Sequence, residues 1–381
     1  MKRFRMVNAG GNAALILQIT DTNGAIAEGC TVYQIALDGI YFDSAKPPRL
    51  GKTMLVPSAK ADWLVVCNIP GTYELRSVKS PDDDVSMGGM KQYQGKLLTI
   101  KINGTQTSTV IPTSLPAKQS FVSDFRNLTE DEVTGRFVIE VGPDLTLNRE
   151  RFQSNTNFRF VANLNTVQEW YIINTATSAH PIHIHVNNFQ VISYNNYTGP
   201  IGAKVMENKV FFDQNKQQCD RQYENFNKSI QAMLPDNDYN KWLKYRGHAQ
   251  RWRDMESYPN GTLGYSPSGI FQDVILVPPF SNITIRFRTD RFIGTVVIHC
   301  HILYHEDQGM MMVTKIVPAG ANTDGAHIKS GDAYPGQCSK CDPFPFNQVV
   351  GECSGSRRKH FNIIILVTGV LATFILFIVT E

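Results

Sequence analysis

Two short histidine-rich segments constrain this chain more than any other feature. The segment HCHILYHEDQGMMM covers residues 299–312, and HPIHIH covers residues 180–185. Six of the nine histidines of the chain fall in these two segments. His180 and Cys300 lie 120 residues apart, so a site that uses both segments needs a folded, Greek-key-like β-sheet to bring them together.

The run VVIHCH, residues 296–301, is typical of a β-strand. Successive strand side chains point to opposite faces, so His299 and His301 are expected on one face and Cys300 on the other. On a second strand, His183 and His185 likewise share a face, while His180 lies beyond Pro181 and is free to face another site.

The residue types predict copper. Two imidazoles, a thiolate and a more distant thioether are the ligands of a blue-copper site. Cys300, His305 and Met310 can supply three of them, and the segment HPIHIH contains candidates for the second imidazole. Gly309 gives the loop after Cys300 the freedom to turn back toward the thiolate. Core histidines or a zinc site are the alternatives, but zinc has no use for a soft thioether placed ten residues after the cysteine.

With these motifs the chain resembles the multicopper oxidases, the family of laccases and ferroxidases. The resemblance extends to KRFRMVNAG, IALDGIYFD, VQEWYIIN and FQDVILVPP, and it covers most of residues 1–320. It implies that His180, Cys300 and His305 bind a type 1 copper, with Met310 as its axial ligand. It also implies that His183 is a ligand of the type 2 copper, and that His185, His299 and His301 bind the type 3 pair.

The resemblance also implies the activity. A donor would be oxidised at the type 1 copper, and electrons would pass through Cys300 to His299 and His301 and on to a three-copper cluster that reduces dioxygen to water. The donor is expected to be a phenolic or aromatic molecule or ferrous iron. Glu306 and Asp307, next to His305, are candidate iron ligands, or otherwise ordinary loop residues or hydrogen-bond partners of a ligand histidine.

One departure from the family pattern concerns four of the eight cluster histidines. The family supplies these four from HWHG-like and HxH signatures in an N-terminal domain, and neither signature occurs before His180. The chain is therefore expected to correspond to the second and third domains of a three-domain oxidase. The alternative function is a chain that binds only type 1 copper and acts as an electron carrier or is an inactive fragment.

The fold prediction is all-β, with two cupredoxin-like Greek-key sandwiches and a C-terminal hydrophobic helix. Short strands with turn signals predict a first sandwich at residues 1–110, and a second, with the copper motifs, at 136–320. A proline-containing polar stretch at 111–135 is the predicted linker. Residues 206–266 are charged and rich in Tyr and Trp, which is typical of either a lid near the type 1 copper or a glycosylated surface excursion.

Cysteines and glycosylation signals favour the secretory pathway. Apart from Cys300, six cysteines remain, which allows up to three disulfides whose pairing the sequence leaves open. Six N-x-S/T signals occur, of which several are expected by chance. The six cysteines are Cys30, Cys67, Cys219, Cys338, Cys341 and Cys353, and the signals are at Asn103, Asn127, Asn196, Asn227, Asn260 and Asn282.

The C-terminal stretch FNIIILVTGVLATFILFIVT, residues 361–380, is long and apolar enough for a bilayer-spanning helix. We expect a membrane anchor after a cysteine-containing tail at 321–360, as a transmembrane helix or a glycolipid-anchor signal, with the copper domains on the extracellular or luminal side. The net charge of +3, from 37 basic and 34 acidic residues, argues against a nucleic-acid partner.

Overall fold

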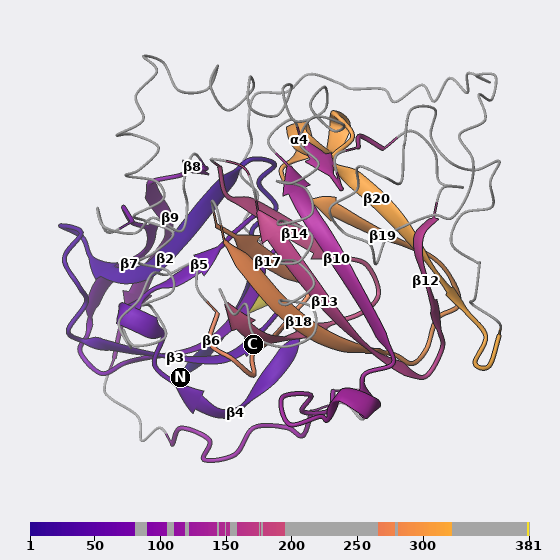
Figure 1. Ribbon diagram of the computed structural model, residues 1–381. Helices are drawn as coiled ribbons and strands as arrows, with labels where there is room; N and C mark the ends of the chain where they lie inside the picture. Colours follow the sequence, from indigo (N-terminus) through magenta and orange to yellow (C-terminus); the bar gives the residue numbers. More distant parts are fainter. Residues whose placement is uncertain are drawn as a thin grey trace.

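The computed structural model describes most of the chain up to residue 321. The described residues are 1–80, 90–104, 110–118, 122–142, 145–148, 150–152, 158–174, 176, 178–194, 266–278, 281–321 and 379–380. Figure 1 shows them as sets of strands, the first part of the chain in indigo and the later part in magenta and orange. The all-β prediction is confirmed, since α4 (Leu303–Asp307) is the one α-helix in the described part.

The first sandwich is built from strands between Lys2 and Ile102 and from the two-residue strand β21 (Val379–Thr380). One of its sheets has the order β21-β1-β6-β3-β4, and the other has the order β5-β2-β7-β9, with β8 paired to β2. Both sheets contribute to one core around the fully buried Trp63. The elements are β1 (Lys2–Val7), β2 (Ala13–Asp21), β3 (Cys30–Leu37), β4 (Ile40–Lys46), η1 (Arg49–Gly51), β5 (Thr53–Leu55), β6 (Lys60–Cys67), β7 (Gly71–Ser77), β8 (Lys91–Gln92), β9 (Gly95–Ile102) and β21 (Val379–Thr380).

The second sandwich is built from strands between Gly135 and Val317. Its sheets have the orders β11-β10-β13-β18-β15-β16 and β12-β20-β19-β14-β17. The elements are η3 (Glu130–Glu132), β10 (Gly135–Gly142), β11 (Thr146–Leu147), β12 (Phe158–Asn163), β13 (Thr166–Asn174), β14 (His180–Ile184), β15 (Phe189–Tyr194), β16 (Phe271–Gln272), β17 (Val274–Val277), β18 (Asn282–Thr289), β19 (Gly294–Cys300) and β20 (Met311–Val317). The boundaries drawn from the sequence at 110 and 135 stay predictions.

Trp170 organises the core of the second sandwich. It lies on β13 in the sequence VQEWYIIN, where every side chain from Val167 to Ile172 is buried. Its ring centroid is 5.6 Å from those of Phe137 and Phe160 and 4.8 Å from that of Phe287. The same core includes Cys300 and residues of both sheets, so the strand that carries the cysteine packs against the opposite sheet through this face.

The two sandwiches pack against each other through apolar side chains. Ala179, Val274 and Leu276 of the second sandwich belong to the core of the first. Ile40, at the start of β4, packs against Phe271 of the second sandwich. The β3–β4 hairpin reaches this position through a tight turn at Asp38 and Gly39, whose φ angles of 45° and 81° suit the Asp-Gly pair of a type I′ turn.

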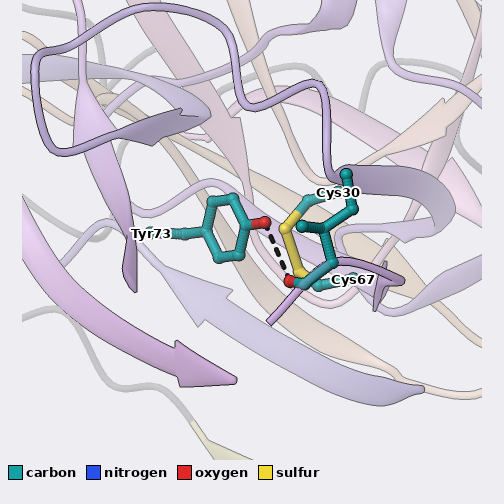
Figure 2. Close-up of a disulfide and its surroundings, with 4 residues drawn as sticks. Cys30, Cys67 and Tyr73 are labelled. Atoms are coloured by element: carbon teal, nitrogen blue, oxygen red, sulfur yellow. Dashed lines mark hydrogen bonds between the residues drawn. A yellow bond between two sulfur atoms is a disulfide. The ribbon is translucent and has the colours of Figure 1, made fainter. Parts of the chain in front are cut away.

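Cys30 and Cys67 form a disulfide between β3 and β6 (Figure 2). The two residues lie directly opposite each other in the strand pairing. Tyr73 lies beside the bond and donates a hydrogen bond to the carbonyl of Ile69 at 2.9 Å. Cys300 is free and buried, as expected of a ligand, while the other four predicted disulfide cysteines lie outside the described residues.

Three sequence expectations change or stay open here. Asn282 is fully buried in β18, so its glycosylation signal is a chance match. The segment 206–266 lies outside the described residues except for Ser266. So does the apolar segment 361–380, except for Val379 and Thr380, which are the strand β21 rather than helix. Of the helices in the described part, none is long and apolar enough to cross a bilayer.

The disulfide predicts a measurable stability difference. Replacing Cys30 and Cys67 together by Ala removes a cross-link between residues 37 apart, which frees the unfolded chain. We expect the free energy of unfolding to fall by about 2–4 kcal/mol in a guanidinium titration. The wild-type chain with this disulfide reduced is the control and should show a similar loss; an unchanged midpoint in the double variant would contradict the prediction.

Candidate metal centre

The two histidine-rich segments are neighbouring antiparallel strands. In the pairing of β14 with β19, Ile182 lies opposite Cys300 and His183 lies opposite His299. Because side chains alternate along each strand, this register puts His183 and His299 on one face of the sheet and Cys300 on the other. The expected separation of the two sets of ligands is thus observed in the backbone pairing.

The first group, here called the Cys300 cluster, consists of His180, Cys300 and His305. The sulfur of Cys300 is 3.6 Å from Nδ1 of His180 and 3.6 Å from Nδ1 of His305. The two Nδ1 atoms are 3.3 Å apart. These atoms converge closely enough to hold one metal ion, and His180 and Cys300 are fully buried while His305 is half-buried.

The turn that brings His305 back consists of α4 and the loop after it. The His305 amide donates to the Ile302 carbonyl, and the Met310 amide donates to the His305 carbonyl at 2.9 Å. Gly309, with a φ of 93°, makes the bend that a larger residue would strain. The Cys300 amide donates to the Met310 carbonyl at 3.0 Å, and the Met310 side chain is fully buried in the same core as Cys300.

The second group, here called the histidine cluster, consists of His183, His185 and His299, with His301 beside them. Nε2 of His185 is 3.2 Å from Nε2 of His299. The His183 ring centroid is 5.0 Å from that of His185 and 5.4 Å from that of His299. The His301 centroid lies 5.2 Å from that of His299. His183, His185 and His299 together form a second set able to hold a metal ion.

Hydrogen bonds to the far side of the rings fix which nitrogen faces each cluster. Nδ1 of His183 is 2.6 Å from the backbone oxygen of Asp273, and Nδ1 of His299 is 3.1 Å from Oε2 of Glu306. Nε2 of His180 is 2.9 Å from the Ser178 hydroxyl. Such outer partners orient ligand histidines and set their tautomers. His180 thereby presents Nδ1 to its cluster, whereas His183 and His299 present Nε2.

Burial keeps the ligand atoms of the metal-free protein uncharged. It lowers the pKa of His180 to about 3 and that of His183 to about 4, so both imidazoles are neutral at pH 7. It also raises the pKa of the Cys300 thiol to about 12. A metal ion that binds this sulfur must displace its proton. The hydrogen bond from His299 lowers the pKa of Glu306, which is therefore a carboxylate.

The donor atoms fit copper. In the Cys300 cluster one soft sulfur and two nitrogen lone pairs face one another inside a dry core, and a buried methionine belongs to that core. In the histidine cluster the Nε2 atoms of His185 and His299 are 3.2 Å apart, close enough for both to hold one cation. Nδ1 of His301 is buried without a hydrogen-bond partner in the described part. A thiolate, imidazoles and a thioether are together the preferred donors of copper.

The structure also identifies residues that the sequence reasoning did not single out. Ser178 and Asp273 hold ligand rings, and Asp273 is in turn held by Lys60 and Asp38 of the first sandwich. Both aspartates lie in segments on which the family resemblance rests, Asp273 in FQDVILVPP and Asp38 in IALDGIYFD. Their roles depend on contacts across more than two hundred residues, which no local pattern reveals.

The comparison with protein families agrees with this site. The model of one family, described as multicopper oxidase, matches residues 116–320, which include every residue of both clusters. A search of curated protein sequences found no match.

Solved multicopper oxidases share the fold. A metallo-oxidase from Campylobacter jejuni is 19% identical, with a TM-score of 0.51 over 82% of this chain and 53% of that one. A laccase from Pediococcus acidilactici is 19% identical, with a TM-score of 0.50 over 83% of this chain and 50% of that one. A variant of the McoA oxidase from Aquifex aeolicus is 17% identical, with a TM-score of 0.50 over 82% and 55%. The chain spans about half the length of these proteins.

The lowered pKa of His180 predicts how the metal-free protein responds to acid. Its folded pKa of about 3 lies below the ordinary 6.5, so between these values the unfolded chain binds the extra proton. The contribution of the neutral His180 to the free energy of unfolding is complete above pH 6.5. It is lost as the pH falls toward 3, by about 1.4 kcal/mol per pH unit.

His180→Asn should therefore flatten this loss. Between pH 7 and pH 5 we expect the free energy of unfolding to fall less in the variant than in the metal-free wild type. Urea titrations with a chelator present measure both values. His185→Asn, at a more open position, is the control and should shift less. Parallel curves for wild type and His180→Asn would contradict the prediction.

Proposed function

The chain belongs to the multicopper oxidase family, whose model spans more than half of it, and we propose that it forms the donor-oxidising part of a copper-dependent oxidoreductase that reduces dioxygen. Its copper ligands would be the residues of the two clusters, with Met310 as a further ligand beside the Cys300 cluster. Because the chain spans about half the length of the solved relatives, the activity of the whole protein is part of this proposal.

One observation carries the proposal: two sets of metal donors lie on opposite faces of a single pair of strands. Cys300 belongs to one set, and its neighbour His299 in the chain belongs to the other. A protein that only carried electrons would need the Cys300 cluster alone and would have no use for the histidine cluster. The paired arrangement therefore favours an oxidase over a carrier.

Copper bound at these positions supplies one-electron redox chemistry, in which a donor is oxidised one electron at a time and dioxygen is reduced. The chain supports this by its own covalent structure. Cys300 is joined by one peptide unit to His299 and by another to His301, so a bonded path of only two consecutive residues connects the two clusters. The surrounding core, with Ile298 and Ile182 fully buried, excludes water from that path.

The surface beside His305 favours an organic donor. Leu303 and Tyr304, on the same short helix as His305, are 51% and 64% exposed, and they offer an apolar and an aromatic surface next to the half-buried imidazole. Glu306 is turned toward His299, at 3.1 Å, instead of toward solvent. Glu306 therefore has a structural partner, while Asp307, the other candidate iron ligand, is exposed. We propose a phenolic or aromatic donor.

The test starts with the copper content of the purified chain, together with its visible and paramagnetic resonance spectra. A blue site plus further copper, with donor-dependent oxygen uptake, is the result expected for an oxidase. One blue copper without oxygen uptake would support the alternative of a carrier or an inactive fragment. A chain that binds no copper would overturn the proposal.

Cys300→Ser should abolish the intense blue absorption, because that absorption requires the thiolate as a ligand. We expect the fold to survive, since serine is smaller than cysteine and has two imidazoles as hydrogen-bond partners. Circular dichroism checks the fold of the variant against that of the wild type. Blue colour retained in Cys300→Ser would rule out the assignment.

Replacing His183 and His185 together by Ala should leave the blue absorption in place while the chain loses copper from the histidine cluster. The reason is the strand alternation, which separates these side chains from Cys300. Copper per chain and paramagnetic resonance measure the two sites separately. Loss of the blue colour together with the second site would mean that the clusters are not independent.

A further inference from the structure

Three ionisable residues connect the first sandwich to the histidine cluster. Lys60 is the first residue of β6, and Asp38 lies in the β3–β4 turn. Asp273 lies between β16 and β17 of the second sandwich. Asp38 is buried and Lys60 is partly exposed. None of the three is a candidate metal ligand, so their arrangement calls for a separate explanation.

Asp273 is held from two directions by the first sandwich. Nζ of Lys60 is 3.0 Å from Oδ1 and 2.8 Å from Oδ2 of the Asp273 carboxylate. The Asp273 amide donates to Oδ2 of Asp38 at 3.1 Å. The other Asp38 oxygen accepts from the Lys60 amide at 2.8 Å, so the two holding residues are also bonded to each other. Both the side chain and the backbone of Asp273 are thereby fixed.

The backbone oxygen of Asp273 acts directly on His183. It is 2.6 Å from Nδ1 of the imidazole. A carbonyl oxygen can only accept a hydrogen bond, so Nδ1 carries the proton and Nε2 has the free lone pair. The Asp273 carboxylate is also close, with Oδ1 3.8 Å from the same Nδ1. Both of these oxygens are acceptors and favour a proton on Nδ1, and Lys60 keeps the residue that carries them in place beside the ring.

From these contacts we propose that Lys60 and Asp38 are positioning residues for His183, which hold Asp273 so that the imidazole keeps its proton on Nδ1 and offers Nε2 to the metal. The inference deepens the proposed function, because it takes His183 as a ligand of the histidine cluster. Correct assembly of this cluster then depends on the first sandwich, although every ligand in the described part comes from the second.

The test compares Lys60→Met with Lys60→Arg in the full chain. Methionine keeps the length of the side chain and removes the charge, while arginine restores a two-point bond to the carboxylate. Lys96→Met is the matched control, since Lys96 forms an ion pair with Glu74 at 3.4 Å within the first sandwich. Asp38→Asn is a second test variant, because asparagine tolerates the left-handed turn but accepts fewer amide hydrogen bonds.

Two measurements are made on each variant. The first is the ¹⁵N nuclear magnetic resonance signal of the His183 ring in the metal-free chain, which distinguishes the two tautomers. The second is the affinity of the histidine cluster for Cu²⁺ by paramagnetic resonance titration, with the blue absorption of the Cys300 cluster as internal reference. We expect Lys60→Met and Asp38→Asn to lose the single Nδ1–H tautomer and to bind Cu²⁺ about 10- to 100-fold more weakly, as for other outer partners of metal ligands.

Lys60→Arg and Lys96→Met should behave as the wild type in both measurements. A single Nδ1–H tautomer and unchanged affinity in Lys60→Met would overturn the inference. So would an equal effect of Lys96→Met, which would reduce Lys60 to a general contribution to stability. If the wild type binds no Cu²⁺ at the histidine cluster, the proposed function fails, while the tautomer measured without metal still decides the role of Lys60.

Discussion

The register between β14 and β19 is the constraint on which the rest of the site depends. With Ile182 opposite Cys300 and His183 opposite His299, the two histidine-rich segments share one hydrogen-bonded ladder. A shift by one residue would move each side chain to the other face and exchange the partners of both clusters. The buried isoleucines on the Cys300 face oppose such a shift, because it would bring histidines into the core in their place.

Much of the site could be predicted because its information is local. Alternation along a strand separates Cys300 from His299 and His301 whatever the rest of the fold, and Gly309 permits the return of His305. The assembly of the sandwiches is different, since the contact of Lys60 with Asp273 joins residues 213 apart. The pairing of Cys30 with Cys67 likewise depended on which strands become neighbours. The glycosylation signal at Asn282 is local and nevertheless misleads, because a three-residue motif carries no information about the burial of its asparagine.

The short helix α4 ties the two clusters to each other and to the first sandwich. His305 belongs to the Cys300 cluster, and the next residue, Glu306, bonds to His299 of the histidine cluster. At the start of the helix, the Leu303 amide donates to the Gly11 carbonyl at 2.8 Å. A side chain at Gly11 would begin only 3.0 Å from Leu303, so the absence of one lets the helix dock closely. Gly11 directly follows the segment KRFRMVNAG, on which part of the family resemblance rests.

The first sandwich therefore supports both clusters without supplying a ligand from its described residues. Gly11 braces the helix that carries His305, and Asp38 with Lys60 braces the carbonyl that orients His183. Burial leaves the imidazoles neutral and the Cys300 thiol protonated, so folding does not bury uncompensated charges at the ligands. Metal binding at Cys300 then requires the proton of the thiol to leave.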